Sequence, residues 1–194
     1  PQVDVSLVTS ERSHNMLRTD IDVAVLFGDG RFKQGESHWL FSEEVFPVCS
    51  PLLLKDRPAP LPAQALMELP LLHLRGENSS HWFDWSGVFR SLGIGTSPAP
   101  GQLRFDNYTL LIQAAIGGQG VAIGWRHLVD NLLAQGLLVR PINETALSSF
   151  GYYVVLPQRK RRRALIQQFV DWLMSEQAGS AESLTGLALP SIAV

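Results

Sequence analysis

The sequence predicts an α/β protein with largely parallel sheets, built as two lobes joined by two crossover strands. Strand-like and helix-like segments alternate along the chain, as they do in βαβ units. The apolar run at residues 22–27 is continuous, which is typical of a strand covered on both faces of its sheet. Two extended stretches, residues 37–50 and 148–157, are longer than one lobe needs, so we expect both to cross between lobes.

The elements of the first half follow from apolar spacing and from the glycines and prolines between the apolar runs. Strands are expected where apolar and β-branched residues run together, and helices where a serine or proline precedes a helical period. In order, the elements are a strand at 3–9, a helix at 12–18, a strand at 22–27 ended by the turn 28–30, the extended stretch 37–50, a helical turn from Pro51, a short helix within 58–70, a strand at 71–74 and a helix at 79–93.

The second half continues the alternation, with glycine ending helices and Pro141 ending a strand. In order, the elements are a strand at 102–105, a helix that starts after Phe105, a strand at 120–124, a helix at 126–136, a strand at 137–141, the extended stretch 148–157 and an amphipathic helix at 161–177.

The two crossovers divide the chain into lobes. Residues 1–47 and 149–177 form lobe I, residues 50–147 form lobe II, and residues 178–194 are left as a tail. Open α/β sheets bind ligands at the carboxyl ends of their strands. We therefore expect a ligand cleft between the lobes.

The composition excludes several classes of protein. The 16 Lys and Arg residues against 18 Asp and Glu residues give no overall positive field that would hold nucleic acid. No apolar run reaches the length of a membrane span, and the start has no signal-peptide pattern. The single cysteine, Cys49, excludes an internal disulfide and offers no thiol cluster for a metal. We expect a protein of the cytosol without a metal, a cofactor or a membrane partner.

The stretch FDNYTLLIQAAIGGQGVAIGW, residues 105–125, is the most informative. Its glycines follow a helix and precede a strand, the reverse of the order in a phosphate-binding loop, so they predict a C-cap and a tight turn. The free N–H groups of the helix start lie among the run Asp106, Asn107, Tyr108 and Thr109. The alternative for Asp106 or Asn107 is a plain N-cap role. With Trp125 at the end of the strand, this unit predicts half of a small-molecule clamp.

Catalytic chemistry has little support in the sequence. There is no motif of a serine hydrolase, zinc protease or nucleotide-binding loop, and the five histidines are scattered. Glu43 and Glu44 are adjacent in an extended stretch, where neighbouring side chains point to opposite faces, so they make a poor catalytic pair. An enzyme is therefore not expected.

The chain resembles the effector-binding domain of LysR-type transcriptional regulators, in particular the glycine-cleavage-activator-like branch. The motifs that carry the resemblance are TDIDVAVLFGDG, EEVFPVCSPLLL, LLHL, QAAIGGQGVAIG and LLVRP, in this order. It implies two Rossmann-like lobes of the type 2 periplasmic-binding-protein kind, in a cytoplasmic regulator with an N-terminal winged helix-turn-helix. The regulator would bind DNA through that missing domain and act as a homodimer or homotetramer. The first strand and helix of the domain would precede Pro1.

The resemblance also implies an effector site. Carried over onto this chain, it falls on Thr9, Ser10, Phe27, Gly28, Asp106, Asn107, Tyr108, Thr109 and Trp125. Of the other tryptophans, Trp82 and Trp85 are expected to pack their helix on its lobe.

Two functions from different classes fit this pattern. One is the ligand-sensing domain of a transcription regulator, and the alternative is the solute-binding protein of a transporter. A weaker similarity to regulators of choline-sulfate use suggests choline, choline sulfate or betaine as effector. Phe27, Tyr108 and Trp125 would then surround a methylated ammonium group beside Asp29 and Asp106. The rival effector is an amino acid or organic acid held at the helix N-terminus.

Overall fold

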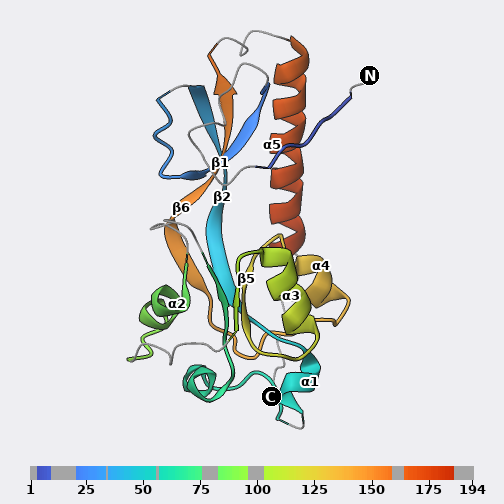
Figure 1. Ribbon diagram of the computed structural model, residues 1–194. Coiled ribbons are helices and arrows are strands. Elements are labelled where there is room, and N and C mark those ends of the chain that lie inside the picture. The colour runs from blue at the N-terminus through green and yellow to red at the C-terminus, as the bar shows by residue number, and fades with distance from the viewer. Residues whose placement is uncertain are drawn as a thin grey trace, which may run out of the picture. The chain divides into compact units, whose positions relative to one another are not determined.

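The computed structural model describes residues 4–9, 21–33, 35–55, 57–75, 83–95, 103–158 and 164–185 (Figure 1). The chain forms two compact units. Unit 1 consists of Pro1–Phe41 and Phe150–Val194, and unit 2 consists of Ser42–Ser149. The chain therefore passes between the units twice.

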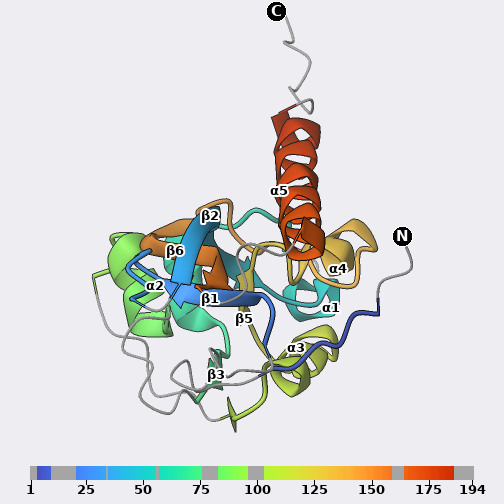
Figure 2. The ribbon, with the colours of Figure 1, turned by 90° about the horizontal axis from the view of Figure 1, so that it is seen from above.

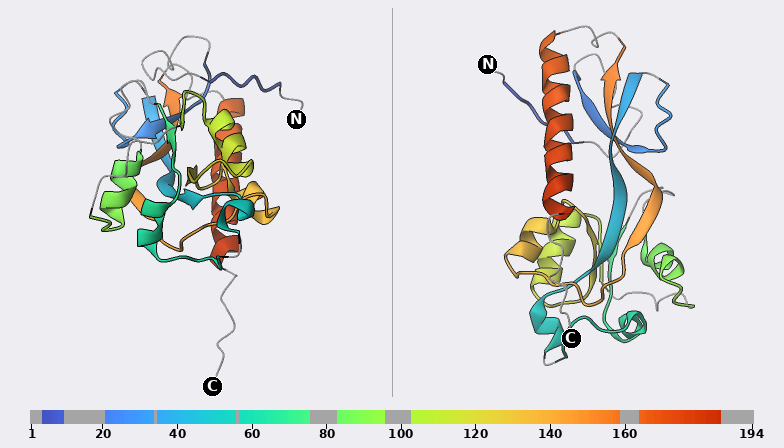
Figure 3. Two further views of the ribbon diagram at one scale, coloured as in Figure 1. Left: turned by 60° about the horizontal axis from the view of Figure 1, so that its bottom comes forward. Right: turned by 180° about the vertical axis from the view of Figure 1, so that it is seen from behind.

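Two long strands carry the chain between the units: β2 (Gly35–Val48) and β6 (Ala146–Pro157) (Figure 3). With β1 (Ala24–Gly28) and β5 (Ala122–Trp125) they form a four-stranded sheet in the order β1-β6-β2-β5. β1 pairs antiparallel with β6, and β5 pairs antiparallel with β2. The prediction of largely parallel sheets is wrong for these pairs, because each long strand lies beside a strand that runs the opposite way.

In unit 1, helix α5 (Ala164–Thr185) packs on one face of the strands (Figure 2). The buried residues of this contact are Leu40, Val154, Leu156, Ile166 and Val170. A smaller cluster, Ala24, Leu26 and Val155, is buried separately. Val25 of β1 is 48% exposed, so the run 22–27 is not covered on both faces as predicted.

Unit 2 contains a second sheet and most of the helices. β3 (Leu72–Leu74) pairs parallel with β4 (Leu103–Phe105), and Leu71 forms a parallel bridge with Val121 beside β5. The helical elements are α1 (Pro51–Leu54), the 3-10 helix η2 (Ala63–Glu68), α2 (Trp85–Ser91), α3 (Tyr108–Ile116) and α4 (Asp130–Ala134). The parallel pairing expected from strand–helix alternation is thus found in this unit.

The core of unit 2 is large and apolar. The part of β2 that lies in this unit is buried on both faces, because Val45 and Phe46 belong to different hydrophobic clusters. Trp85 is only 2% exposed, and its Nε1 donates a hydrogen bond to the carbonyl oxygen of Leu72 at 2.8 Å. The predicted packing of this helix by Trp85 is confirmed, whereas Trp82 lies outside the described residues.

The glycines after α3 act as predicted. Gly117 is the C-cap, and Gly118 has a φ of 75°, in the left-handed region that favours glycine. At Gly120, which leads into β5, an added Cβ would lie 2.7 Å from the carbonyl oxygen of Pro70. The glycine-rich turn is therefore a helix stop and a close backbone contact.

Two predicted strands are wrong. Residues 4–9 form no strand and are all exposed, although their apolar residues alternate. Alternation supports a strand only where a neighbour supplies backbone hydrogen bonds, and the described part of the chain places none beside this segment. The strand at 137–141 is reduced to one bridge between Val139 and Cys49. The helix expected at 12–18 lies outside the described residues.

Helix boundaries also differ from the expected ones. The helix expected at 126–136 begins at Asp130, because His127 takes a left-handed conformation with φ 72°. α2 starts at Trp85 with Asp84 as its N-cap, where a serine cap was expected at residue 79. α5 extends to Thr185, beyond the expected end at residue 177.

Candidate ligand-binding site

The start of α3 carries four of the predicted site residues. Asn107 is the N-cap, and its Oδ1 accepts a hydrogen bond from the backbone N–H of Leu110 at 3.1 Å. Asp106 and Thr109 are exposed, and Tyr108 is half-buried. The plain N-cap interpretation therefore holds for Asn107, and this cap also leaves the polar helix start open to solvent.

Tyr108 joins α3 to the end of β5. The Tyr108 and Trp125 rings meet edge to face, with centroids 5.3 Å apart. The Tyr108 hydroxyl accepts a hydrogen bond from the backbone N–H of Trp125 at 3.3 Å and donates one to the carbonyl oxygen of Ile123 at 3.4 Å. The structure thus brings together two residues that are 17 positions apart and that the sequence assigned to one site.

Trp125 is held from its other side by Glu43 of β2. Its indole Nε1 donates a hydrogen bond to Glu43 Oε1 at 2.9 Å, and both residues are buried. The second carboxylate oxygen, Oε2, has no hydrogen-bond partner of good geometry among the described residues. Burial raises the pKa of the Glu43 carboxyl, and interactions with Trp125, Ser148 and the backbone of Phe83 oppose this rise.

The next residue along β2 forms a matching contact on the opposite face. Glu44 Oε1 lies 2.6 Å from Arg126 Nη2, and the two side chains are about one quarter exposed, at 24% and 26%. Two adjacent glutamates therefore hold two adjacent residues at the end of β5. The alternation of side chains along β2 was predicted, but the role of Glu43 was missed.

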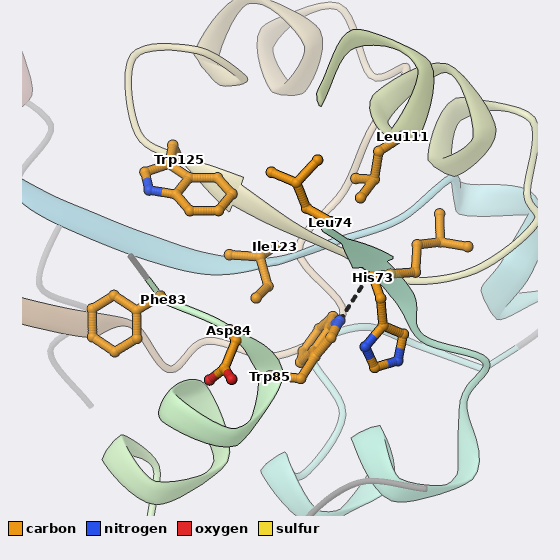
Figure 4. Close-up of a pocket in the computed structure, with 9 residues that line it drawn as sticks. His73, Leu74, Phe83, Asp84, Trp85, Leu111, Ile123 and Trp125 are labelled. Atoms are coloured by element: carbon orange, nitrogen blue, oxygen red, sulfur yellow. Dashed lines mark hydrogen bonds between the residues drawn. The ribbon is translucent and has the colours of Figure 1, made fainter. Parts of the chain in front are cut away.

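A pocket in unit 2 opens beside Trp125 (Figure 4). Its cavity volume is only about 30 Å³, so the pocket is a small hollow open to solvent. β3, β5, α3 and the start of α2 supply its walls. The lining residues of this unit 2 pocket are Leu72, His73, Leu74, Phe83, Asp84, Trp85, Leu111, Ile123 and Trp125. The pocket is thus apolar and rich in aromatic rings, with one acidic and one imidazole side chain.

The two titratable residues of the pocket have different surroundings. Asp84 Oδ1 caps α2 by accepting a hydrogen bond from the backbone N–H of Gly87 at 2.6 Å. Burial lowers the pKa of His73, and Arg104 lowers it further while Asp84 acts in the opposite direction. The neutral imidazole is therefore favoured, and Asp84 is the acidic group among the lining side chains.

Phe27 lies in unit 1, within a cluster of four half-buried aromatic rings. Its centroid is 5.2 Å from that of Tyr152 and 5.9 Å from that of Phe150, and Tyr152 is 5.0 Å from Phe41. Phe27 and Tyr152 are direct partners in the β1–β6 ladder. The sequence assigned Phe27 to the site but gave no sign of its three neighbours, because their contact depends on strand register.

The remaining predicted residues of unit 1 are less constrained. Gly28 ends β1, and an added Cβ there would lie 3.0 Å from the Phe32 ring. Thr9 is exposed in the segment 4–9, and Ser10 lies outside the described residues. Asp29 is exposed and accepts a hydrogen bond from the backbone N–H of Arg31 at 3.0 Å. The assembly of these residues with Trp125 into one cleft stays a prediction.

Among the described residues, no group of three or more His, Cys, Asp or Glu side chains is placed to hold a metal ion. In that same set, no helix has the length and apolar character needed to cross a membrane.

The fold places the molecule in a known structural class. The effector domain of the transcriptional regulator AmpR of Pseudomonas aeruginosa matches it with a TM-score of 0.73 at 22% identity, over 94% of this chain and 84% of that one. The regulatory domain of CrgA, a LysR-type regulator from Neisseria meningitidis, matches with a TM-score of 0.68 at 21% identity, over 89% and 83%. The class is therefore the α/β effector-binding fold of the type 2 periplasmic-binding-protein kind.

The sequence identifies the family within this class. Residues 1–178 match the LysR substrate binding domain, and the chain belongs to that family. The glycine cleavage system transcriptional activator of Escherichia coli K12 is 30% identical over 183 residues. The regulator DsdC of the same organism is 29% identical over 181 residues. The predicted resemblance to LysR-type effector domains is confirmed.

The chain corresponds to part of these relatives. The glycine cleavage activator is matched over 94% of this chain but only 58% of its own length, and DsdC over 91% and 57%. The relatives are transcription regulators, and nothing in the comparisons supports the solute-binding protein of a transporter.

Proposed function

We propose that this chain is the effector-sensing domain of a cytoplasmic transcription regulator, without catalytic activity of its own. The family and the names of its relatives support this function. DNA would be bound by a winged helix-turn-helix in the part of the relatives that this chain does not cover. The regulator would work as a homodimer or homotetramer, with the effector changing how the oligomer holds DNA.

The effector-contacting residues in this proposal come from both units. Unit 1 contributes Thr9, Ser10, Phe27 and Gly28, and unit 2 contributes Asp106, Asn107, Tyr108, Thr109 and Trp125. The observation that carries the proposal is the Tyr108–Trp125 pair, fixed by ring contact and hydrogen bonds beside the unit 2 pocket. A site whose aromatic faces are held in advance loses little conformational entropy when a ligand binds.

The proposed ligand class is a small compound with a quaternary ammonium group, such as choline, choline sulfate or glycine betaine. Three of the pocket-lining residues, Phe83, Trp85 and Trp125, are aromatic, and Asp84 adds a carboxylate. Aromatic faces and acidic groups together favour a methylated cation over a neutral group. The open start of α3, with free N–H groups, suits the carboxylate or sulfate at the other end of such a ligand.

The rival ligand is a small amino acid or organic acid. The helix dipole at the start of α3 would attract the carboxylate of such a ligand, and the aromatic residues would not be needed. The two classes differ in their dependence on Trp125, which an organic acid at the start of α3 would not need.

Calorimetric titration decides between these ligands. Choline, choline sulfate, glycine betaine, glycine, serine and succinate are titrated into the wild-type domain, Trp125→Ala and a control, Trp172→Ala. Trp172 is 53% exposed on α5 and belongs to neither aromatic group of the site. We expect a quaternary ammonium compound to bind the wild type and the control but not Trp125→Ala. Binding of only the acids, or equal binding by Trp125→Ala, contradicts the proposed ligand class.

A further inference from the structure

The chain keeps a carboxyl group in the core of unit 2 at the back of the candidate site. Glu43 is 1% exposed, and the exposed fraction of Trp125, its hydrogen-bond donor, is only 7%. A buried carboxylate loses the favourable hydration that it has in water, and structure must compensate for that loss. A neutral glutamine could accept the same indole hydrogen bond, so this bond alone does not account for an acid at this position.

The hydrogen bonding of Glu43 is incomplete. Oε1 accepts the indole N–H of Trp125 with good geometry, whereas Oε2 makes no such hydrogen bond within the described part of the chain. Ser148 and the backbone of Phe83 also interact with the carboxyl and partly compensate its burial. Glu44, the adjacent acid, forms an ion pair with Arg126, while the structure pairs Glu43 with no cation among the described residues. Buried acids without a neutralising cation are uncommon in native proteins, and they gather where a ligand or a reaction uses them.

Glu43 is close enough to the unit 2 pocket for its charge to affect the electrostatic potential there. Trp125 lines the unit 2 pocket, and its indole nitrogen donates a hydrogen bond to Glu43, so the carboxyl lies one hydrogen bond away from a wall of the pocket. A carboxylate bonded to the indole N–H fixes the orientation of the ring. It also makes the electrostatic potential in the nearby pocket more negative. Salt screens the potential of a buried charge less than that of a charge at the surface.

We propose that Glu43 is a specificity-determining residue, whose negative charge next to the Trp125 indole makes the unit 2 pocket favour a cationic group over a neutral group of the same shape. This inference rests on the proposed function. Glu43 would act on the ligand through Trp125. Its charge would be the physical reason why the pocket selects cations. Glu43 positions the ring and sets the potential of the pocket.

The test compares two ligands of equal shape and different charge. Choline and its neutral carbon isostere, 3,3-dimethylbutan-1-ol, are titrated calorimetrically into the wild type and into Glu43→Gln. Glutamine keeps the volume of the side chain and an oxygen that can accept the indole N–H, but it removes the charge. We expect the ratio of the two dissociation constants to change by about tenfold in favour of the neutral ligand. The affinity for the isostere itself stays unchanged.

Two control variants separate Glu43 from the other acids near the site. Glu44→Gln removes the neighbouring charge, which Arg126 already neutralises, and is expected to leave the ratio unchanged. Asp84→Asn removes the carboxylate that lines the pocket while keeping a good N-cap for α2. A ratio that changes in Asp84→Asn but not in Glu43→Gln assigns the selectivity to Asp84 and overturns the inference.

The outcomes distinguish this inference from the proposed function. If the wild type binds choline and Glu43→Gln retains the full preference for it, the role of Glu43 is wrong while the ligand class stands. If the wild type binds neither ligand, the ligand class fails and the role of Glu43 fails with it. If Glu43→Gln does not fold, Glu43→Asp withdraws the charge by one methylene, and an undiminished preference in that variant overturns the inference.

Discussion

The aromatic residues of the two units are held in different ways. In unit 2, the rings of Tyr108 and Trp125 meet edge to face, and hydrogen bonds fix both the indole nitrogen and the backbone of Trp125. In unit 1, the rings of the Phe27 cluster meet at tilted angles, with centroids 5.0 to 5.9 Å apart. Hydrogen bonds are directional, and ring contacts tolerate several angles.

This difference suggests that the aromatic residues of the two units have different roles in ligand binding. Trp125 is 7% exposed and locked before any ligand arrives, whereas the unit 1 rings are half-buried and can adjust to a ligand. A prearranged surface supplies selectivity, because a wrong ligand cannot reshape it at low cost. An adjustable surface can instead accept ligands of different shape. We therefore expect ligand selectivity to depend mainly on unit 2.

The largest expected effect comes from truncating the buried ring. Trp125→Ala should destabilise the domain by about 3–5 kcal/mol, because it empties a packed site and removes the indole donor from the Glu43 carboxyl. Phe27→Ala should destabilise by less, because Phe27 is only partly buried. Urea unfolding of both variants measures this. Equal losses would mean that the two aromatic groups are held equally firmly.

A second, smaller effect should follow from Tyr108→Phe. The substitution keeps the ring contact with Trp125 but removes the hydroxyl that bonds the backbone of Trp125 and Ile123. We expect a loss of about 1 kcal/mol in the free energy of unfolding. Choline affinity should fall less than in Trp125→Ala, because the aromatic face stays in place. Calorimetry and urea unfolding on the same sample provide both numbers.

The third prediction concerns the pH dependence of stability. Burial raises the pKa of Glu43 in the folded state. The unfolded chain therefore releases this proton at lower pH than the folded chain does, and the stability contributed by protonated Glu43 is lost as pH rises through the folded pKa. Glu43→Gln removes this loss. We expect its melting temperature to exceed that of the wild type by a few degrees at pH 8 and to match it more closely at pH 4.

Glu44→Gln is the matched control for this pH dependence. Its partly exposed ion pair with Arg126 is worth about 1 kcal/mol at most, and its loss should lower the melting temperature at pH 8. The two adjacent substitutions thus shift stability in opposite directions at the same pH. A fall in both variants would show that Glu43 is stabilised as a carboxylate by groups that compensate its burial.

Sequence patterns specified the local elements of unit 2 well. The helix stop at Gly117, the cap at Asn107 and the strand that ends in Trp125 follow from residue types that act over a few positions. They also predicted that Tyr108 and Trp125 lie close together, as their ring contact shows, because strand–helix units bring such ends together.

Features that depend on register were not predictable in the same way. Glu43 reaches Trp125 only because Val45 pairs with Trp125 in the β2–β5 ladder, and nothing in a single sequence fixes that pairing. The Phe27 cluster likewise depends on the pairing of Phe27 with Tyr152. Residues 4–9 were mistaken for a strand for the converse reason, since alternation was present without a described partner.

The smallest expected effect concerns the N-cap of α3 and separates the ends of the proposed ligand. Asn107→Asp keeps an oxygen that can accept the Leu110 N–H and adds a negative charge at the helix N-terminus. The helix dipole favours this charge, so stability should rise by about 0.3–1 kcal/mol. The same charge should repel a carboxylate or sulfate that binds at the helix start.

This repulsion yields a selective change in affinity. Glycine betaine and choline sulfate should bind Asn107→Asp several-fold more weakly than the wild type, while choline, which has no anionic end, should bind equally well or better. Calorimetric titration of the three ligands into both proteins measures the pattern, and thermal unfolding reports the gain in stability independently. If all three ligands weaken together, the start of α3 is not the anion-binding end of the site. If none changes although the helix is stabilised, the ligand lies away from Asn107 and the pocket beside Trp125 alone holds it.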